Sequence, residues 1–351
     1  MRILLVSPLP PPTGGIATWT VEYLKEGNQK NRDIELVNTA LITKNQEAIV
    51  NKRILTNEVK RTFKILSEMR MKIRWYQPDI VHINTSCSKM GMIRDLVCVQ
   101  IAKKAKIKVL LHCHCNVSDM IGDAFVSKNI FKLIAKKSDY VLGLNKRSLV
   151  YIKEVVGDER CKLIPNFATT NKSKKKLNTN DKVETCIFVG HVRKEKGIFE
   201  IVEVAKMLPN VNFKLLGPVA DDVKKIALPK NIILFGTLDH ELVMEHLKEA
   251  DLFLFPSYSE GFSLAMLEAM SIGLPIIATD VGANKDMIED KGGIIVNTGD
   301  VKSLYVAINE LGDSSIRKSM SNWNIEKVKN NYTTEVVLSK IQSIYCDLIS
   351  N

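Results

Sequence analysis

The sequence of 351 residues lacks several features that mark common classes of protein. No uninterrupted apolar run approaches about 20 residues, so no membrane-spanning helix is predicted. A GxGxxG dinucleotide fingerprint is missing, which argues against an oxidoreductase built on Rossmann domains. The Gly-Lys-Ser/Thr end of a Walker A loop and the Asp-x-Asp metal motif are also missing.

Cysteine is present, but in a pattern that excludes a disulfide framework. The seven cysteines are an odd number without regular spacing, which predicts reduced thiols in a cytosolic protein. Cys113 and Cys115 alternate with His112 and His114 at the end of an apolar run. Because side chains alternate faces along a strand, the histidines should point one way and the cysteines the other. This run alone therefore predicts no four-ligand zinc site.

The positive charge is confined to the first half of the chain. Residues 1–165 hold 28 Lys and Arg against 15 Asp and Glu, a net charge of +13, whereas the remainder holds 22 against 24. Within residues 59–75, cations alternate with apolar residues. This segment is interpreted either as an amphipathic helix lying on an anionic membrane or as a solvated helix packed on its own domain. Nucleic acid is a weaker alternative, since no aromatic platform accompanies the charge.

Short apolar runs alternate with helical patterns along the chain, which predicts parallel sheets with crossover helices. The first run, Ile3 to Val6, is ended by prolines and is expected to be a strand rather than a signal peptide. A polar, basic segment at 171–181 is expected to join two α/β halves, and 314–350 to be helical with a break at 330–332. Predicted strands are 3–7, 34–38, 80–84, 107–111, 140–143, 162–164, 186–189, 213–216, 232–235, 252–255, 276–278 and 293–296.

Ligands of doubly wound sheets bind beyond the carboxyl ends of the strands, often at helix N-termini. Gly14 and Gly15 follow the first strand, where they form either a tight structural turn or a close approach to an anionic ligand. His114 follows the fourth strand, as a structural or a functional histidine. The loop 190–197 follows the first strand of the second half, and its cations form either a diphosphate clamp or a solvated basic turn.

The segment 256–270 is the most specific of these features. The apolar strand LFLFP enters a turn and then a helix expected to begin near Phe262. The backbone N–H groups of Ser263 and Leu264 would then be available to a phosphate. Glu268 lies in an otherwise apolar stretch, where an unpartnered carboxylate would be costly. A ribose would satisfy it, and pairing with a lysine is the alternative.

On these residues the sequence resembles the retaining glycosyltransferases of the GT-B fold, in particular glycosyltransferase family 4 (glycosyl transferases group 1). The resemblance covers nearly the whole chain and rests most on Glu260-x7-Glu268, followed by Ala-Met and Gly-Leu-Pro. It implies an α/β fold of two Rossmann-like, doubly wound parallel-sheet domains facing across a cleft. These would be an acceptor-binding domain at 1–165 and a nucleotide-sugar-binding domain at 166–330, with a helix at 331–351 crossing back onto the first domain.

The resemblance also implies a role for individual residues. His114 and Glu260 would be catalytic, with His112 a less favoured candidate, and Glu260 would contact the hydroxyl groups of the donor sugar. His191 stands where the family usually has arginine, so that Arg193, two residues further on, is the candidate replacement. The donor would be bound by Gly15, Gly190, Arg193, Lys196, Gly261, Phe262, Ser263, Leu264 and Glu268, the last of these at the ribose.

The implied activity is retaining, metal-independent sugar transfer from a UDP- or GDP-sugar to a glycan or lipid-linked acceptor, without a cofactor. Family members with such features often build bacterial capsule or lipopolysaccharide. We therefore expect a cytoplasmic protein, with peripheral contact to the inner face of the plasma membrane as a hypothesis and with no nucleic-acid partner. A GT-B-fold sugar-nucleotide epimerase and a non-catalytic nucleotide-sugar-binding paralogue remain alternatives, although the intact Glu260, Glu268 and Lys196 argue against the second.

Overall fold

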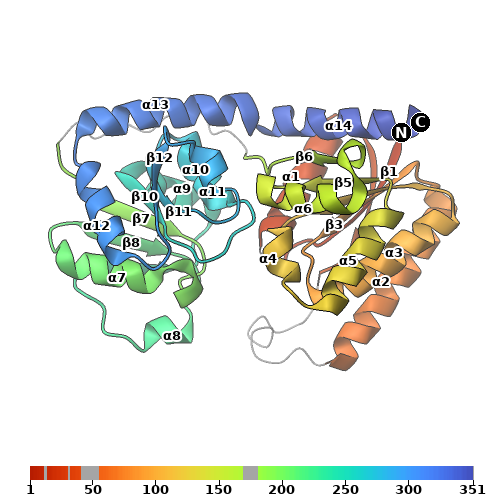
Figure 1. The fold of residues 1–351 in the computed structure, drawn as a ribbon, viewed down its shortest axis with the longest axis horizontal. Helices are drawn as coiled ribbons and strands as arrows, with labels where there is room; N and C mark the ends of the chain where they lie inside the picture. The colour runs from red at the N-terminus through yellow and green to blue at the C-terminus, as the bar shows by residue number, and fades with distance from the viewer. Residues whose placement is uncertain (12–13, 31, 41–54, 169–180, 351) are drawn as a thin grey trace. The chain divides into compact units, whose positions relative to one another are not determined.

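The computed structural model describes residues 1–11, 14–30, 32–40, 55–168 and 181–350. They divide into two compact units, Met1–Asn166 with Val337–Asn351, and Phe167–Val336 (Figure 1). Residues 12 and 13 of the first turn and residues 171–180 of the expected linker lie outside the described part of the chain. No helix of the described residues has the length and apolar content needed to cross a bilayer.

The first unit contains a six-stranded parallel sheet in the order β2-β1-β3-β4-β5-β6. Strands buried on both faces need near-continuous apolar sequence, which is why the apolar runs predicted them. Each predicted strand is confirmed, with ends within two residues of those expected. The strands are β1 (Arg2–Ser7), β2 (Asp33–Asn38), β3 (Ile80–Thr85), β4 (Lys108–Cys113), β5 (Tyr140–Gly143) and β6 (Cys161–Leu163).

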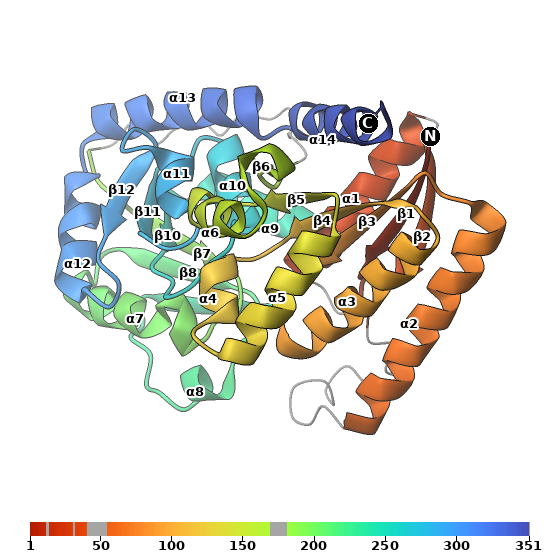
Figure 2. The ribbon, with the colours of Figure 1, turned by 45° about the vertical axis from the view of Figure 1, so that its right-hand side comes forward.

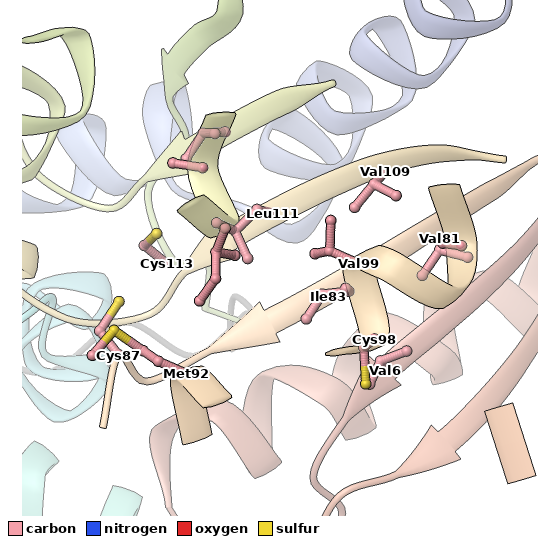
Figure 3. Close-up of a cluster of buried hydrophobic side chains, with 14 of the residues drawn as sticks. Val6, Val81, Ile83, Cys87, Met92, Cys98, Val99, Val109, Leu111 and Cys113 are labelled. Carbon is pink, nitrogen blue, oxygen red and sulfur yellow. The ribbon is translucent and has the colours of Figure 1, made fainter. Parts of the chain in front are cut away.

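Helices cover both faces of this sheet. The chain moves from β1 to β2 in one direction across the sheet, and from β2 through β3 to β6 in the opposite direction. Because crossovers are right-handed, α1 lies on one face of the sheet and the later crossover helices lie on the other. Figure 3 shows the core under the second face, where strand side chains such as Val109 and Leu111 meet Val99 of α3. The helices are α1 (Gly15–Gln29), α2 (Leu55–Tyr76), α3 (Lys89–Lys104), α4 (Val117–Ile121), α5 (Phe125–Lys137), α6 (Lys146–Val156) and α14 (Thr334–Ser350), with a short 3-10 turn η2 (Asp158–Arg160).

The imidazoles of His82, His112 and His114 lie on the α1 face of the sheet, those of His82 and His112 fully buried. The ring of His112 is 4.1 Å from that of His114 and 5.5 Å from that of His82, and Trp19 packs edge-on against all three. The hydroxyl of Tyr345, on α14, lies 2.6 Å from Nδ1 of His82. Cys113 and Cys115 belong to the core of the opposite face, which confirms the predicted alternation.

The second unit contains another six-stranded parallel sheet, in the order β12-β11-β10-β7-β8-β9. All six predicted strands are confirmed. They are β7 (Thr185–Val189), β8 (Asn212–Leu216), β9 (Ile232–Gly236), β10 (Leu252–Phe255), β11 (Ile276–Thr279) and β12 (Gly293–Val296). The helices are α7 (Ile198–Met207), α8 (Asp221–Lys224), α9 (His240–Glu249), α10 (Leu264–Ser271), α11 (Asn284–Ile288), α12 (Val301–Glu310) and α13 (Ser314–Asn331), with a 3-10 turn η3 (Lys194–Lys196). The end of α13 at Asn331 confirms the predicted break.

We predict that acidification destabilises the first unit through the buried imidazoles. Burial lowers the pKa of His112 to about 3 and holds those of His82 and His114 well below the usual value. The folded state then binds fewer protons than the unfolded chain, so stability is full above the unfolded pKa of about 6.5 and is lost as the pH falls below it. Between about pH 8 and pH 5, His112 alone accounts for a loss of about 2 kcal/mol.

Urea unfolding at these two pH values measures the effect. In the variant His112→Phe the loss of stability on acidification should be smaller by about that amount. The variant Leu242→Phe, which changes an exposed residue of the second unit and removes no titratable group, should show the same loss as the parent chain. An unchanged pH dependence in His112→Phe would contradict the prediction.

Candidate active site

Several polar residues of the second unit lie at the point where the strand order of its sheet reverses. β7 is hydrogen-bonded to both β8 and β10, so β10 enters on the opposite side of the first strand of this sheet. The loops that follow β7 and β10 therefore leave from neighbouring carboxyl ends. This is the switch point at which doubly wound sheets bind their ligands.

These two loops are in direct contact. The backbone N–H of Tyr258 donates to the carbonyl of Glu195 at 3.0 Å, and the ammonium of Lys196 contacts the carboxylate of Glu260. Nζ of Lys196 also lies 5.7 Å from the ring centre of Phe255. The side chains of Lys196 and Glu260 are only 19% and 11% exposed, so a cation and a carboxylate are held together at the switch point.

Gly197 permits the two loops to come so close. Its φ of 74° lies in the left-handed region, and a Cβ built on it would be 2.1 Å from the carbonyl oxygen of Pro256. Any side chain at this position would push the loop after β10 away from the loop after β7. The sequence pattern Lys196-Gly197 thus has a steric reason in this fold.

The helix after β10 begins at Leu264, two residues later than expected. Ser263 has an extended conformation and is the N-cap, and its hydroxyl accepts a hydrogen bond from the backbone N–H of Met266 at 3.2 Å. Gly261 and Phe262 therefore belong to the approach to the helix, where the buried ring of Phe262 packs against Tyr332. The remaining N–H groups of the first turn have no partner within the helix, as an anion site requires.

Glu268 has a partner that the sequence did not indicate. Its Oε1 lies 3.1 Å from Nε2 of His240, at the start of α9, and its side chain is 22% exposed. The expected alternative of a lysine partner is therefore wrong. The two residues are 28 positions apart, so no local pattern could have linked them.

The loop after β7 carries the cations Arg193 and Lys196 beside His191. Arg193 is half-exposed, and its Nε lies 3.6 Å from a carboxylate oxygen of Glu195. Partial burial, followed by the charges of Arg193 and Lys196, lowers the pKa of His191. Gly190 begins this loop, and its backbone N–H donates to the carbonyl of Leu216 at 2.9 Å.

The first unit has a cavity of about 300 Å³ at its own switch point, between β1 and β3. Its lining includes Gly14 and Gly15, the glycines expected to approach a ligand, whereas the polar side chains there were not predicted from the sequence. The guanidinium of Arg94 is paired with the buried Asp95 at 2.7 Å, and Arg61 is paired with Glu58 at 2.9 Å. The lining also includes Thr39, Asn84, Ser86 and Ser88.

His114 lies outside this lining, just after β4. Its backbone N–H donates to the carbonyl of Thr85 at 2.8 Å, and its ring lies 5.1 Å from that of Trp19. Nε2 of His114 is buried and has no hydrogen-bond partner among the described residues. The lowered pKa keeps the imidazole neutral, so it can exchange hydrogen bonds with a hydroxyl group without carrying charge.

The two doubly wound sheets, each with polar residues at a switch point, define a class of nucleotide-binding enzymes built on paired Rossmann-like units. Residues 169–327 match the family Glycosyl transferases group 1. The second unit therefore carries a glycosyltransferase domain of this family, and the chain has the GT-B fold, as the resemblance of the sequence predicted.

Three known proteins illustrate the relationship. The chain is 25% identical over 333 residues to UDP-Gal:alpha-D-GlcNAc-diphosphoundecaprenol alpha-1,3-galactosyltransferase of Escherichia coli, covering 83% of this chain and 82% of that protein. It is 24% identical over 253 residues to the capsular polysaccharide biosynthesis glycosyltransferase CapM of Staphylococcus aureus, covering 68% and 63%. The structure of sucrose-phosphate synthase from Thermosynechococcus elongatus is similar with a TM-score of 0.81 and 17% identity over 99% of both chains, which supports the fold alone.

We predict that Gly197→Ala destabilises the second unit by more than a matched glycine substitution. Gly236→Ala is the control, because Gly236 also has a positive φ, of 69°, but a Cβ added there would meet only open space. Both variants carry the cost of a left-handed alanine, about 1–2 kcal/mol. Gly197→Ala should lose about 1–3 kcal/mol more in urea unfolding, because the loop after β10 must move. Equal losses in the two variants would show that the close approach contributes nothing.

Proposed function

We propose that the chain transfers a sugar, with retention of configuration, from a UDP- or GDP-sugar to a glycan or lipid-linked acceptor in the synthesis of a bacterial surface polysaccharide. The observation that carries the proposal is the contact of Lys196 with Glu260 beside the N-terminus of α10. The names of the two relatives support the biological setting, since one uses UDP-Gal with a diphosphoundecaprenol-linked sugar and the other acts in capsule synthesis.

In this proposal the second unit binds the donor. The diphosphate lies against Lys196, Arg193 and the N–H groups at the start of α10, and the ribose hydroxyls bind Glu268. Negative charge builds up on the diphosphate as the bond from the sugar breaks, and fixed donors aimed at it stabilise that state. These protein cations take the part that a metal ion plays in other transferases, so we propose that the reaction is independent of metal.

We propose the following chemical step for these groups. The bond between the anomeric carbon and the diphosphate oxygen breaks, and an acceptor hydroxyl attacks from the same face. Its proton passes to the departing phosphate oxygen, so neither a protein nucleophile nor a cofactor is needed. Glu260 holds the hydroxyl groups of the donor sugar, and the neutral His114 hydrogen-bonds to the reacting sugar.

The cavity of the first unit is proposed as the acceptor site. Its hydroxyl, amide and guanidinium groups, from residues such as Thr39, Asn84 and Arg94, suit the hydroxyl groups of a glycan. A sugar-nucleotide epimerase would have no use for such a site, because it needs no acceptor. The proposal also includes peripheral contact of the basic first unit with an anionic membrane from the cytoplasmic side.

Nucleotide binding gives the first test. The free energy gained from a ligand present at about 100 times its dissociation constant is about 2.7 kcal/mol, so a bound nucleotide should raise the unfolding midpoint by several degrees. We expect a rise with UDP or GDP and their sugars, lost in Glu268→Ala. The control Glu203→Ala removes an exposed carboxylate of α7, paired with Lys206, and should keep the rise. No rise with any nucleotide would contradict the donor site.

Turnover gives the second test, with a polyprenyl-diphosphate-linked sugar as acceptor and a panel of UDP- and GDP-sugars. Lys196→Ala should lower the rate of nucleoside diphosphate release about 100-fold or more, as expected for the loss of a group that stabilises the leaving charge. Lys206→Ala, which removes an exposed cation of α7 paired with Glu203, should leave the rate nearly unchanged.

The same assay separates the remaining possibilities. The rate should be unchanged when EDTA is added, and NMR of the product should show the anomeric configuration of the donor. Conversion of the sugar nucleotide without acceptor would favour the epimerase instead. Inactivation by EDTA would overturn metal independence, and an inverted product would overturn retention.

A further inference from the structure

Three helices of the first unit, α2, α3 and α5, lie side by side on the face of the sheet opposite α1 (Figures 1 and 2). Their inner sides form the core, with Ile65 and Met69 of α2, Val99 of α3 and Phe131 of α5 among its members. Figure 3 shows this packing for α3. Apolar residues on the outer sides of these helices are therefore not part of this core.

The outer sides carry large apolar side chains in unusual number. Phe125 is 79% exposed, Phe63 69% and Trp75 57%. Among the described side chains of the three helices, nine large hydrophobic ones are exposed, which we call the apolar set: Val59, Phe63, Met71, Trp75, Met90, Ile93, Phe125, Val126 and Leu133. Large apolar side chains left in water on three neighbouring helices indicate an interaction site.

The same outer sides are positively charged. The three helices contain 14 Lys and Arg residues and 3 Asp and Glu residues, a net charge of +11 that equals that of the whole chain. Asp95 is buried, and Glu58 and Glu68 are partly buried and paired with cations. The exposed cations, which we call the basic set, are Lys60, Lys64, Arg70, Arg74, Lys89, Lys104, Lys132, Lys136 and Lys137. Lys103 is also exposed but is paired with Asp139 at 2.8 Å.

The topology places part of the apolar set next to the cavity of the first unit. Crossover helices of a parallel sheet run opposite to its strands, so all three helices begin at the carboxyl edge of the sheet. Phe63, Ile93 and Phe125 thus lie toward the edge that holds the cavity. Met90 belongs both to the apolar set and to the lining of the cavity.

We propose that the outer face of α2, α3 and α5 docks on an anionic lipid bilayer, with the apolar set entering the headgroup region and the basic set binding the lipid phosphates. The combination of exposed aromatic side chains with cations, and without exposed acids on these helices, is complementary to such a surface. This inference deepens the proposed function, on which it rests for the nature of the acceptor. A lipid-linked acceptor would reach the cavity past Met90 while its lipid stays in the membrane.

Vesicle binding by the full chain tests the proposal. The chain should float with vesicles of roughly equimolar phosphatidylglycerol and phosphatidylcholine, and should bind pure phosphatidylcholine at least tenfold more weakly, because cations add to binding only on an anionic surface. The tryptophan emission should shift to the blue on binding, since the exposed Trp75 leaves water. In Trp75→Phe that shift should vanish while binding remains.

A matched pair of variants distinguishes binding through this face from nonspecific hydrophobic binding to vesicles. Phe63→Ser with Phe125→Ser should weaken binding to the anionic vesicles at least tenfold, because the most exposed apolar anchors are removed. Met207→Ser with Leu242→Ser removes exposed apolar residues of the second unit and should bind like the parent. Equal binding by all three chains would overturn the proposal. So would concentration-dependent dimerisation lost only in the first variant, which would make the face a contact between copies.

Failure of this inference is distinguishable from failure of the proposed function. The Phe63 and Phe125 variant should keep the nucleotide-dependent rise in the unfolding midpoint and its turnover with an acceptor that carries a short, water-soluble chain. It should lose turnover only with acceptor embedded in vesicles. Vesicle binding without any nucleotide binding would support the docking face and contradict the proposed transferase function.

Discussion

The contact of the loop after β7 with the loop after β10 is the constraint on which the candidate donor site depends. This contact exists because β8 and β9 lie on one side of β7 in the sheet, whereas β10, the next strand in the chain, pairs with β7 on the other side. Gly197 then lies against the carbonyl of Pro256, and the approach brings Lys196 to Glu260. A cation and a carboxylate 64 residues apart thus become neighbours through strand order.

The first unit follows the same topological rule with different chemistry. The strand order of its sheet also reverses, between β1 and β3, and the cavity lies at that point. Its arginines are neutralised by nearby acids, whereas the loop after β7 carries cations in excess of its acids. A neutral, hydroxyl-rich lining suits a sugar, while an excess of cations suits a diphosphate, so one topology used twice gives two candidate sites with different chemistry.

The sequence predicted the elements well because each depends on local pattern. Buried parallel strands require continuous apolar runs, and the alternation of His112 with Cys113 required only the period of a strand. Contacts between distant residues were not accessible in the same way. The pairing of Glu268 with His240 and the assembly of the cavity around Arg94 depend on strand order, which a single sequence does not encode locally. The start of α10 was misplaced because the cap at Ser263 was not recognised.

The segment 59–75 shows most clearly why the structure was needed. Its apolar residues fitted two interpretations, a membrane face or a packed helix, and the structure shows that the helix has apolar residues enough for two surfaces. Ile65, Met69 and Ile73 belong to the core, whereas Phe63 and Trp75 are exposed among cations. Folding therefore does not require the exposed aromatic residues, and leaving them in water gains nothing for stability. A second surface that covers them, of opposite charge, accounts for both the aromatic and the basic residues of this helix.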